Sequence, residues 1–273
     1  KTINSINKQT YLPKEIIIVS NKRIIQKINL NKKILLKIFL SNVKNQVFQR
    51  NIAIKNISNS CNIFLQLDDR IILDRRCLYE LNELWKKSDA ITLGIGLNQN
   101  NKLINQGLFN KVVNNFNLKG KVLANGINID YCNLKKDKEV MWLKGGLSSW
   151  RIKRNQKIKD RKYPIKNWSV FEDVEFCLNK KKNEKLLVAH RAKVNIIESK
   201  HKIDIRNLFY RGATHTSSQK KLVKKFFKNM TYFYLTIPIL IFFSLVISVF
   251  TINISKFIYN LGRFRGFFII DFN

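Results

Sequence analysis

Asp68 and Asp69 are adjacent carboxylates at the end of an apolar run, and Arg70 follows them at once. Paired carboxylates can hold Mg²⁺ or Mn²⁺ against a phosphate, because hard divalent cations prefer oxygen ligands. A guanidinium can instead bind a phosphate directly through its planar fork. A surface turn with a local ion pair is the alternative without chemistry. The segment therefore predicts either a phosphate-handling site or a plain turn.

A second acidic group lies far along the chain, where Glu172, Asp173 and Glu175 fall within four positions. The whole chain has 51 Lys and Arg but only 18 Asp and Glu, so such a cluster is unusual in it. A carboxylate held near a hydroxyl can accept its proton during an attack on carbon. Acids also stabilise the first turn of a helix, which is the structural alternative.

The elements that must position these acids show an α/β pattern. Short, β-branched apolar runs predict strands that are buried on both faces, and they alternate with longer mixed stretches. These runs are residues 15–21, 34–42, 62–69 and 90–97. Leu78, Leu81, Leu84 and Trp85 are spaced as the buried stripe of a helix. We therefore expect a mainly parallel sheet with helices on both faces and ligands at the carboxyl ends of its strands.

The C-terminal part of the chain differs in kind. Residues 232–252 carry no charge, and a helix of that length spans about 30 Å of hydrocarbon. We expect a transmembrane helix over 231–253, with Pro238 in its first turns. The tail, residues 254–273, becomes apolar again towards its end and is either a membrane-proximal segment or the start of a second membrane segment.

A basic amphipathic segment precedes this apolar stretch, within residues 206–230. Its apolar side chains share one helical face and five lysines surround them. This pattern is typical of a helix that lies in the headgroup region of an anionic membrane. The apolar positions are Leu222, Val223, Phe226 and Phe227. Because fewer cations follow the apolar stretch, we expect the preceding domain on the cytoplasmic side of the cell (inner) membrane.

The net charge of +33 raises nucleic acid as a partner. The bias of the chain towards Lys, Asn and Ile weakens that inference, because A/T-rich coding produces the same composition. The basic residues are also spread through every segment. We therefore expect no nucleic-acid partner and keep a basic nucleic-acid-binding protein as the less favoured alternative. The four cysteines and three histidines show no metal-ligand spacing.

Five segments, in this order, resemble the inverting family-two glycosyltransferases of GT-A fold. They are SINKQTYLPKEIIIVSN (5–21), QRNIAI (49–54), FLQLDDRIIL (64–73), WLKGGLSSWRI (142–152) and FEDVEFCL (171–178). The resemblance implies a three-layer α/β/α sandwich over residues 1–205, without the strand that opens the fold in that family. It also implies a nucleotide-sugar donor, and an acceptor that is a saccharide or a lipid-linked molecule.

The resemblance assigns roles to residues on both sides of the reaction. Asp173 corresponds to the base that takes a proton from the acceptor, with Glu172 beside it as a binding or orienting group. Gly145 and Gly146 correspond to a tight backbone approach to a sugar, and the indole of Trp150 is then available to stack on a pyranose. A plain turn followed by a core tryptophan is the alternative.

The donor side corresponds to Asp68, Asp69, Arg70 and Arg50. The family places its metal-binding acid two positions after the first aspartate, and that position here is Arg70. Three hypotheses follow: the Arg70 guanidinium binds the diphosphate, Asp69 becomes the metal ligand, or the enzyme is weak or inactive. A Mg²⁺ or Mn²⁺ cofactor is therefore in question. If the strand stays extended, Asp68 and Arg70 point to the same side.

The sequence thus predicts a membrane-anchored glycosyltransferase of the cytoplasmic face that adds a sugar with inversion in the synthesis of cell-surface polysaccharide or glycolipid. No Gln-x-x-Arg-Trp segment follows residue 178, and its absence favours a single addition over polymerisation. A catalytically silent membrane scaffold of the same fold is the alternative that Arg70 favours.

Overall fold

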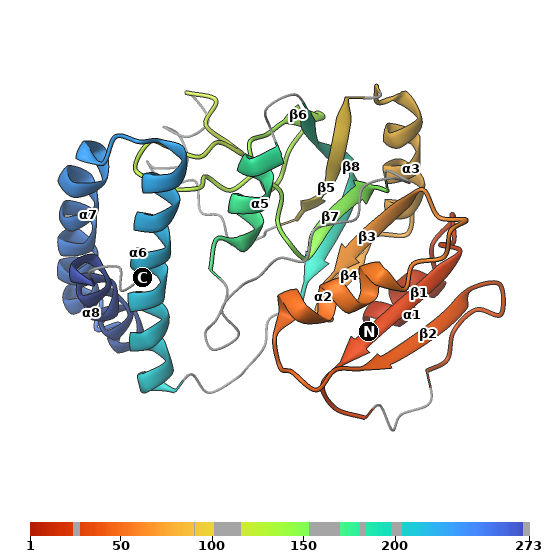
Figure 1. Cartoon of the computed structure of the whole chain (residues 1–273), viewed down its shortest axis with the longest axis horizontal. Coiled ribbons are helices and arrows are strands. Elements are labelled where there is room, and N and C mark those ends of the chain that lie inside the picture. Colours follow the sequence, from red (N-terminus) through yellow and green to blue (C-terminus); the bar gives the residue numbers. More distant parts are fainter. Residues whose placement is uncertain are drawn as a thin grey trace.

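A computed structural model describes residues 1–23, 28–89, 91–100, 116–152, 170–180, 184–197 and 204–269. Its strands form two sheets (Figure 1). The first sheet contains β1 (Glu15–Ser20) and β2 (Leu35–Leu40), which pair in parallel from Glu15 opposite Leu35 to Ser20 opposite Leu40. All four predicted strands form, except that Ala90 lies outside the described residues. The predicted burial on both faces is wrong for β2, because Leu35, Ile38 and Leu40 are exposed.

The second sheet has six strands in a mixed arrangement. Its members are β3 (Ile63–Leu67), β4 (Ile71–Leu73), β5 (Thr92–Gln99), β6 (Lys138–Glu139), β7 (Leu147–Arg151) and β8 (Lys185–Ile196). The order is β3-β7-β5-β8-β4, and β6 also pairs with β8. Among the strands of this sheet that the structure describes, β5 and β8 are the one parallel pair. The α/β class is confirmed, whereas the expected mainly parallel sheet is confirmed only in part, because β7 returns antiparallel between β3 and β5.

Separate hydrophobic cores cover the two faces of this sheet. Alternate residues of β8 enter different cores, with Leu186 on one side and Ala189 on the other. The first core contains residues of α1 (Thr2–Asn7) and α3 (Cys77–Lys87), and the second contains residues of α5 (Glu172–Lys180). The predicted stripe of α3 faces the first core. Helices thus pack on both faces of the sheet, as the sequence pattern predicted.

Three further helices follow β8 and pack beside one another (Figure 1). They are α6 (Ile205–Phe226), α7 (Thr231–Phe250) and α8 (Ile254–Phe268). Glycines let α6 and α8 approach to backbone contact: a Cβ on Gly212 would collide with the carbonyl of Tyr259, and one on Gly262 with that of Phe209.

A helix was expected within residues 206–230, and α6 confirms it. The lipid environment expected for its apolar face is not observed. Leu222 is 3% exposed and Val223 is fully buried, and both belong to cores of the protein. Phe226 and Phe227 pack against the same cores. The prediction that this face lies among lipid headgroups is therefore wrong, because the face is taken up by the α/β domain and α7.

Helix α7 is long and apolar enough to cross a membrane, and it is the single helix of that kind within the described parts of the chain. Only one stripe of it is buried, which includes Phe233, Ile237 and Ile241. Large apolar side chains such as Phe242 and Phe250 are exposed. This exposed apolar surface supports membrane association of α7. The tail forms a separate helix, α8, up to Phe268.

Candidate functional site

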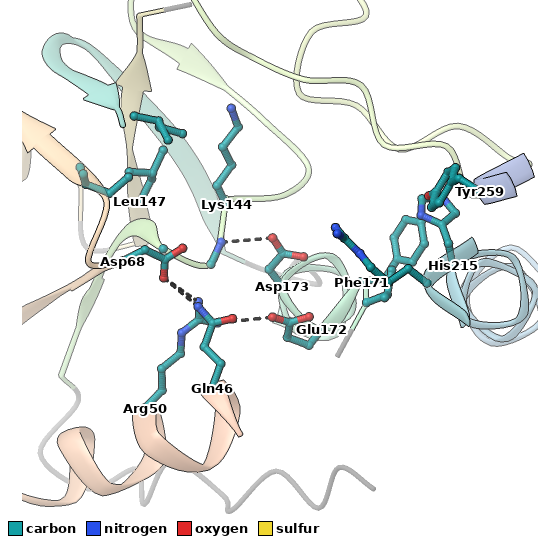
Figure 2. A pocket seen from close by; sticks show the side chains of 16 residues that line it. Gln46, Arg50, Asp68, Lys144, Leu147, Phe171, Glu172, Asp173, His215 and Tyr259 are labelled. Atoms are coloured by element: carbon teal, nitrogen blue, oxygen red, sulfur yellow. Dashed lines mark hydrogen bonds and ion pairs between the residues drawn. The ribbon is translucent and has the colours of Figure 1, made fainter. Parts of the chain in front are cut away.

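A cavity of about 390 Å³ lies where the C-terminal end of β3, the turn before β7 and helices α2 (Gln46–Lys55), α5, α6 and α8 meet. Both groups of acids reach it, since Asp68, Glu172 and Asp173 all line it (Figure 2). Two acidic segments that lie far apart in the chain therefore meet at one cavity.

Arg50 links the two acidic segments. Its guanidinium lies 3.4 Å from Asp68 Oδ1 through Nη2 and 3.4 Å from Glu172 Oε1 through Nη1. Gln46, one helical turn earlier on α2, donates from Nε2 to the same Asp68 oxygen at 2.8 Å (Figure 2). The side chain of Asn45 caps this helix by accepting a hydrogen bond from Phe48 N. The N-terminal part of α2 therefore fixes a cation between the acids.

Gly145 and Gly146 make the approach of these groups possible. A Cβ on Gly145 would lie 2.8 Å from Nη1 of Arg50, and one on Gly146 would overlap the Asp68 carboxylate. The amide of Gly145 donates to Asp173 Oδ2 at 3.1 Å. The glycine pair was predicted to give a close backbone approach to a sugar. The groups that it approaches in the structure are the side chains of Arg50, Asp68 and Asp173.

Asp173 lies in the first turn of α5. Burial raises the pKa of its carboxyl, and the opposing effects are hydrogen bonds from the amides of Val174 and Gly145 and the charge of Arg50. A carboxylate with a raised pKa is a stronger base than an exposed one, which suits proton abstraction near neutral pH. Glu175 has a structural role, because it accepts from Lys225 of α6 at 2.6 Å.

Asp69 and Arg70 do not line the cavity. Strand β3 ends at Leu67, and residues 68–71 form a turn in which Ile71 N donates to Asp68 O at 3.2 Å. Both side chains are exposed. The alternation expected for an extended strand therefore stops before it reaches Arg70, and neither the Arg70 phosphate fork nor the Asp69 metal ligand is supported. The cation that contacts Asp68 in the cavity is Arg50 instead.

Trp150 belongs to the core. Its side chain is 5% exposed, packs edge-on against Phe176 at 4.7 Å and donates from Nε1 to Ser148 Oγ. The cavity of about 40 Å³ that it borders is too small for a sugar ring. The prediction that its indole stacks on a sugar is therefore wrong, because β7 directs Trp150 to the packed face of the sheet, against Gly94 of β5.

The donor set does not fit a resident divalent cation. Among the described residues there is no group of three His, Cys, Asp or Glu side chains placed to hold one. The position between Asp68 and Glu172 already contains the Arg50 guanidinium. Two carboxylates that share an arginine have less negative charge to offer a metal ion. No step of the chemistry is therefore assigned to Mg²⁺ or Mn²⁺.

The comparisons with known proteins give no relationship: no protein-family model matches this sequence, and no match is found among curated proteins. The resemblance to glycosyltransferases thus depends on the five motifs and on the convergence that the geometry adds.

Several residues of the cavity were not predicted. Lys144 precedes the glycine pair and lines the cavity, with Nζ 2.7 Å from Asp130 Oδ1 and 2.6 Å from Gln99 Oε1. Its position next to Gly145 was a usable signal. The C-terminal helices add three more lining residues, for which the sequence holds no local signal. These are Arg211, His215 and Tyr259.

Proposed function

We propose that the protein is an inverting glycosyltransferase of GT-A fold that uses a nucleotide-sugar donor. The observation that carries this proposal is the meeting of Asp68, Arg50 and Asp173 in one cavity, although they come from three separate segments. The layered α/β/α packing around a mixed sheet is compatible with that fold.

In the proposed reaction an acceptor hydroxyl attacks the anomeric carbon of the donor sugar. The new bond is the one between the acceptor oxygen and that carbon, and the bond to the diphosphate breaks with its electron pair on the diphosphate. The acceptor proton goes to Asp173, whose raised pKa makes it a suitable base. One base opposite the leaving group gives inversion.

The departing diphosphate needs positive charge. Arg50 and Lys144 are the cations that line the acidic end of the cavity, and each is held by carboxylates. When the diphosphate binds, its oxygens would replace these carboxylates as partners of the cations. Asp68 is then free to accept hydrogen bonds from hydroxyl groups of the donor.

The membrane part of the proposal rests on α7. Its exposed apolar surface would hold the protein at a membrane, and the lysines of α6 favour an anionic leaflet. We propose the cytoplasmic face of the inner membrane, an acceptor at that surface, and a single sugar addition in polysaccharide or glycolipid synthesis.

The test uses the full chain purified in a neutral detergent, with release of nucleoside diphosphate measured over a panel of nucleotide sugars. We expect release from one donor class and its loss in Asp173→Asn. The matched control is Glu175→Gln, two residues along the same helix, whose carboxylate pairs with Lys225 outside the cavity. Folded protein that releases no diphosphate from any donor would instead favour the silent scaffold.

A further inference from the structure

The chain enters the helix of the acids in a rare backbone conformation. Phe171, directly before Glu172 and Asp173, has φ = 66°, in the left-handed region that residues with a bulky side chain seldom adopt. The residue before a helix usually has an extended backbone instead. A left-handed conformation of this kind persists only where the surrounding structure holds it, and it is frequent at functional sites. We therefore looked for the contacts that hold Phe171.

The position of Asp173 follows from the conformation of Phe171. The Phe171 carbonyl accepts a hydrogen bond from the amide of Glu175 at 2.8 Å, in the first turn of α5. Asp173 belongs to the same turn and accepts from the amide of Gly145 at 3.1 Å. A change of Phe171 to a negative φ would rotate the peptide that follows it and move Asp173 away from Gly145. The amides of Gly145 and Glu175 therefore report on the conformation of Phe171.

The Phe171 ring is held from outside the α/β domain by His215 of α6. The two rings pack edge-on, with centroids 4.9 Å apart, and in Figure 2 the Phe171 ring lies between the acids and His215. Burial, with a smaller effect of Arg263, lowers the pKa of His215 to about 4, so its ring is neutral at pH 7 and packs as an aromatic group. Phe171 is only 8% exposed. His215 thus helps to keep Phe171 in place.

Helix α6 is itself packed on the two helices that follow it. A Cβ on Gly266 of α8 would collide with the carbonyl of Ala213, two residues before His215. Val223, further along α6, is buried together with Ile237 of α7, the helix that is able to cross a membrane. A shift of α7 or α8 would therefore move α6 and the ring that holds Phe171.

We propose that His215 is a positioning residue for Asp173, and that the packing of α6 on α7 and α8 regulates the site through it. In the seated state the His215 ring keeps Phe171 left-handed and Asp173 on the Gly145 amide. In the released state Phe171 has a negative φ and Asp173 has left Gly145. The two conformations of one residue provide the two states that a switch requires. This inference deepens the proposed glycosyltransferase function and rests on it for the role of Asp173, whereas the coupling itself is measured without turnover.

The experiment measures hydrogen exchange at the amides of Gly145 and Glu175 in the full chain in neutral detergent. His215→Ala should speed exchange at both by about 2-fold to 12-fold, the factor that corresponds to the loss of one edge-on ring contact. His215→Phe keeps a ring and should exchange like the wild type. The matched control is Tyr210→Ala, which removes an exposed ring of the same helix outside the cavity. Unchanged exchange in His215→Ala, or an equal effect of Tyr210→Ala, overturns the proposal.

Glycine at position 171 tests whether His215 acts through Phe171. Glycine adopts a positive φ readily, so the first turn of α5 in Phe171→Gly no longer depends on a ring contact. Adding His215→Ala to Phe171→Gly should then have no further effect on the two amides. Additive effects of the two substitutions would show that His215 acts elsewhere, and would overturn the proposal.

Gly266→Leu tests regulation by the C-terminal helices, because Gly266 lies outside the cavity and its substitution acts through the contact of α8 with α6. We expect faster exchange at the amides of Gly145 and Glu175 in this variant as well. Unchanged exchange at both amides overturns the regulation.

Turnover separates this inference from the proposed function. His215→Ala should lower kcat by at most the factor observed in exchange, because the released state lacks its base. The KM for the donor and the affinity for nucleoside diphosphate should stay the same, and His215→Phe should restore kcat. A rise in KM for the donor with unchanged kcat would assign His215 to the donor and overturn its positioning role. The expected exchange in a protein that releases no nucleoside diphosphate from any donor supports the coupling while refuting the glycosyltransferase.

Discussion

Replacing Asp173 by Asn tests the role of this residue as the base of the proposed reaction, apart from its role in folding. Asparagine has nearly the same shape, and its carbonyl oxygen can still accept from the Gly145 amide. The amide group cannot accept the proton of an acceptor hydroxyl. General-base catalysis typically contributes about 10²-fold to 10⁴-fold, so we expect kcat to fall by that factor with a small change in KM.

The stability of Asp173→Asn has a predictable sign. Because burial raises the folded pKa of Asp173 above the ordinary value of 3.8, the contribution of the protonated carboxyl to stability is fully present below that ordinary value. This contribution is lost as the pH rises through the folded pKa, and at pH 7 the buried charge opposes folding. Asparagine removes the charge but loses the bond from the Val174 amide, a loss of about 1 kcal/mol.

We therefore expect a thermal midpoint at pH 7 close to or above that of the wild type, together with a strongly reduced kcat. Thermal unfolding followed by tryptophan fluorescence and release of nucleoside diphosphate are the two assays, both in the same detergent. A variant that unfolds early at pH 7 would show that the carboxylate stabilises the fold. A variant with unchanged kcat would refute the assignment of Asp173 as the base.

Three further substitutions test the surroundings of this acid. Arg50→Met removes a cation that lowers the pKa of Asp173, so the acidic limb of the pH–rate profile should move to higher pH. The KM for the donor should also rise. An acidic limb at unchanged pH would argue against an effect of Arg50 on Asp173. Activity of the unaltered chain should also persist in EDTA, and strict metal dependence would contradict the role given to Arg50. Gly146→Ala displaces the Asp68 carboxylate and should reduce kcat/KM by about 10²-fold with a smaller effect on stability, as compared by steady-state kinetics and thermal unfolding. Trp150→Ala should lower the free energy of unfolding by about 3–5 kcal/mol, measured in urea, because the side chain is buried. The KM for the donor in the folded fraction should stay the same. A rise in KM without a loss of stability would show that the indole contacts the sugar.

The sequence predicted the parts of the site that depend on element type and chain order. Asp68 follows a strand, so it was expected at an edge of the sheet where ligands bind, whereas only the resemblance assigned Asp173 to the same reaction. The same reasoning gave a wrong direction for the Arg70 side chain. Its predicted direction required the strand to continue, but the chain turns at residues 68–71, and the apolar run of residues 71–73 forms a separate strand, β4, on β8.

Trp150 and Leu222 show a second reason for wrong predictions. Each has a side chain that suits either a ligand surface or a core, and only the neighbours decide which. Gly94 of β5 leaves space under the Trp150 indole, and the segment containing Val122 packs in the same core as Leu222. These neighbours lie far away in the chain, so periodicity alone could not distinguish a buried face from a membrane-facing one.

The side of the cavity that α6 and α8 form depends on a packing relation that no local pattern contains. Arg211 and His215 face the cavity as part of α6, but Tyr259 reaches it only because α8 packs directly on α6. That approach requires glycine at positions 212 and 262, where any Cβ would collide with the backbone of the other helix. A Gly262→Leu substitution would therefore separate the helices, and Tyr259 would move away from Arg211. The α6–α8 contact should be lost in that variant, whereas the acid cluster, which is held by α2, α5 and the turn before β7, should keep its affinity for nucleoside diphosphate.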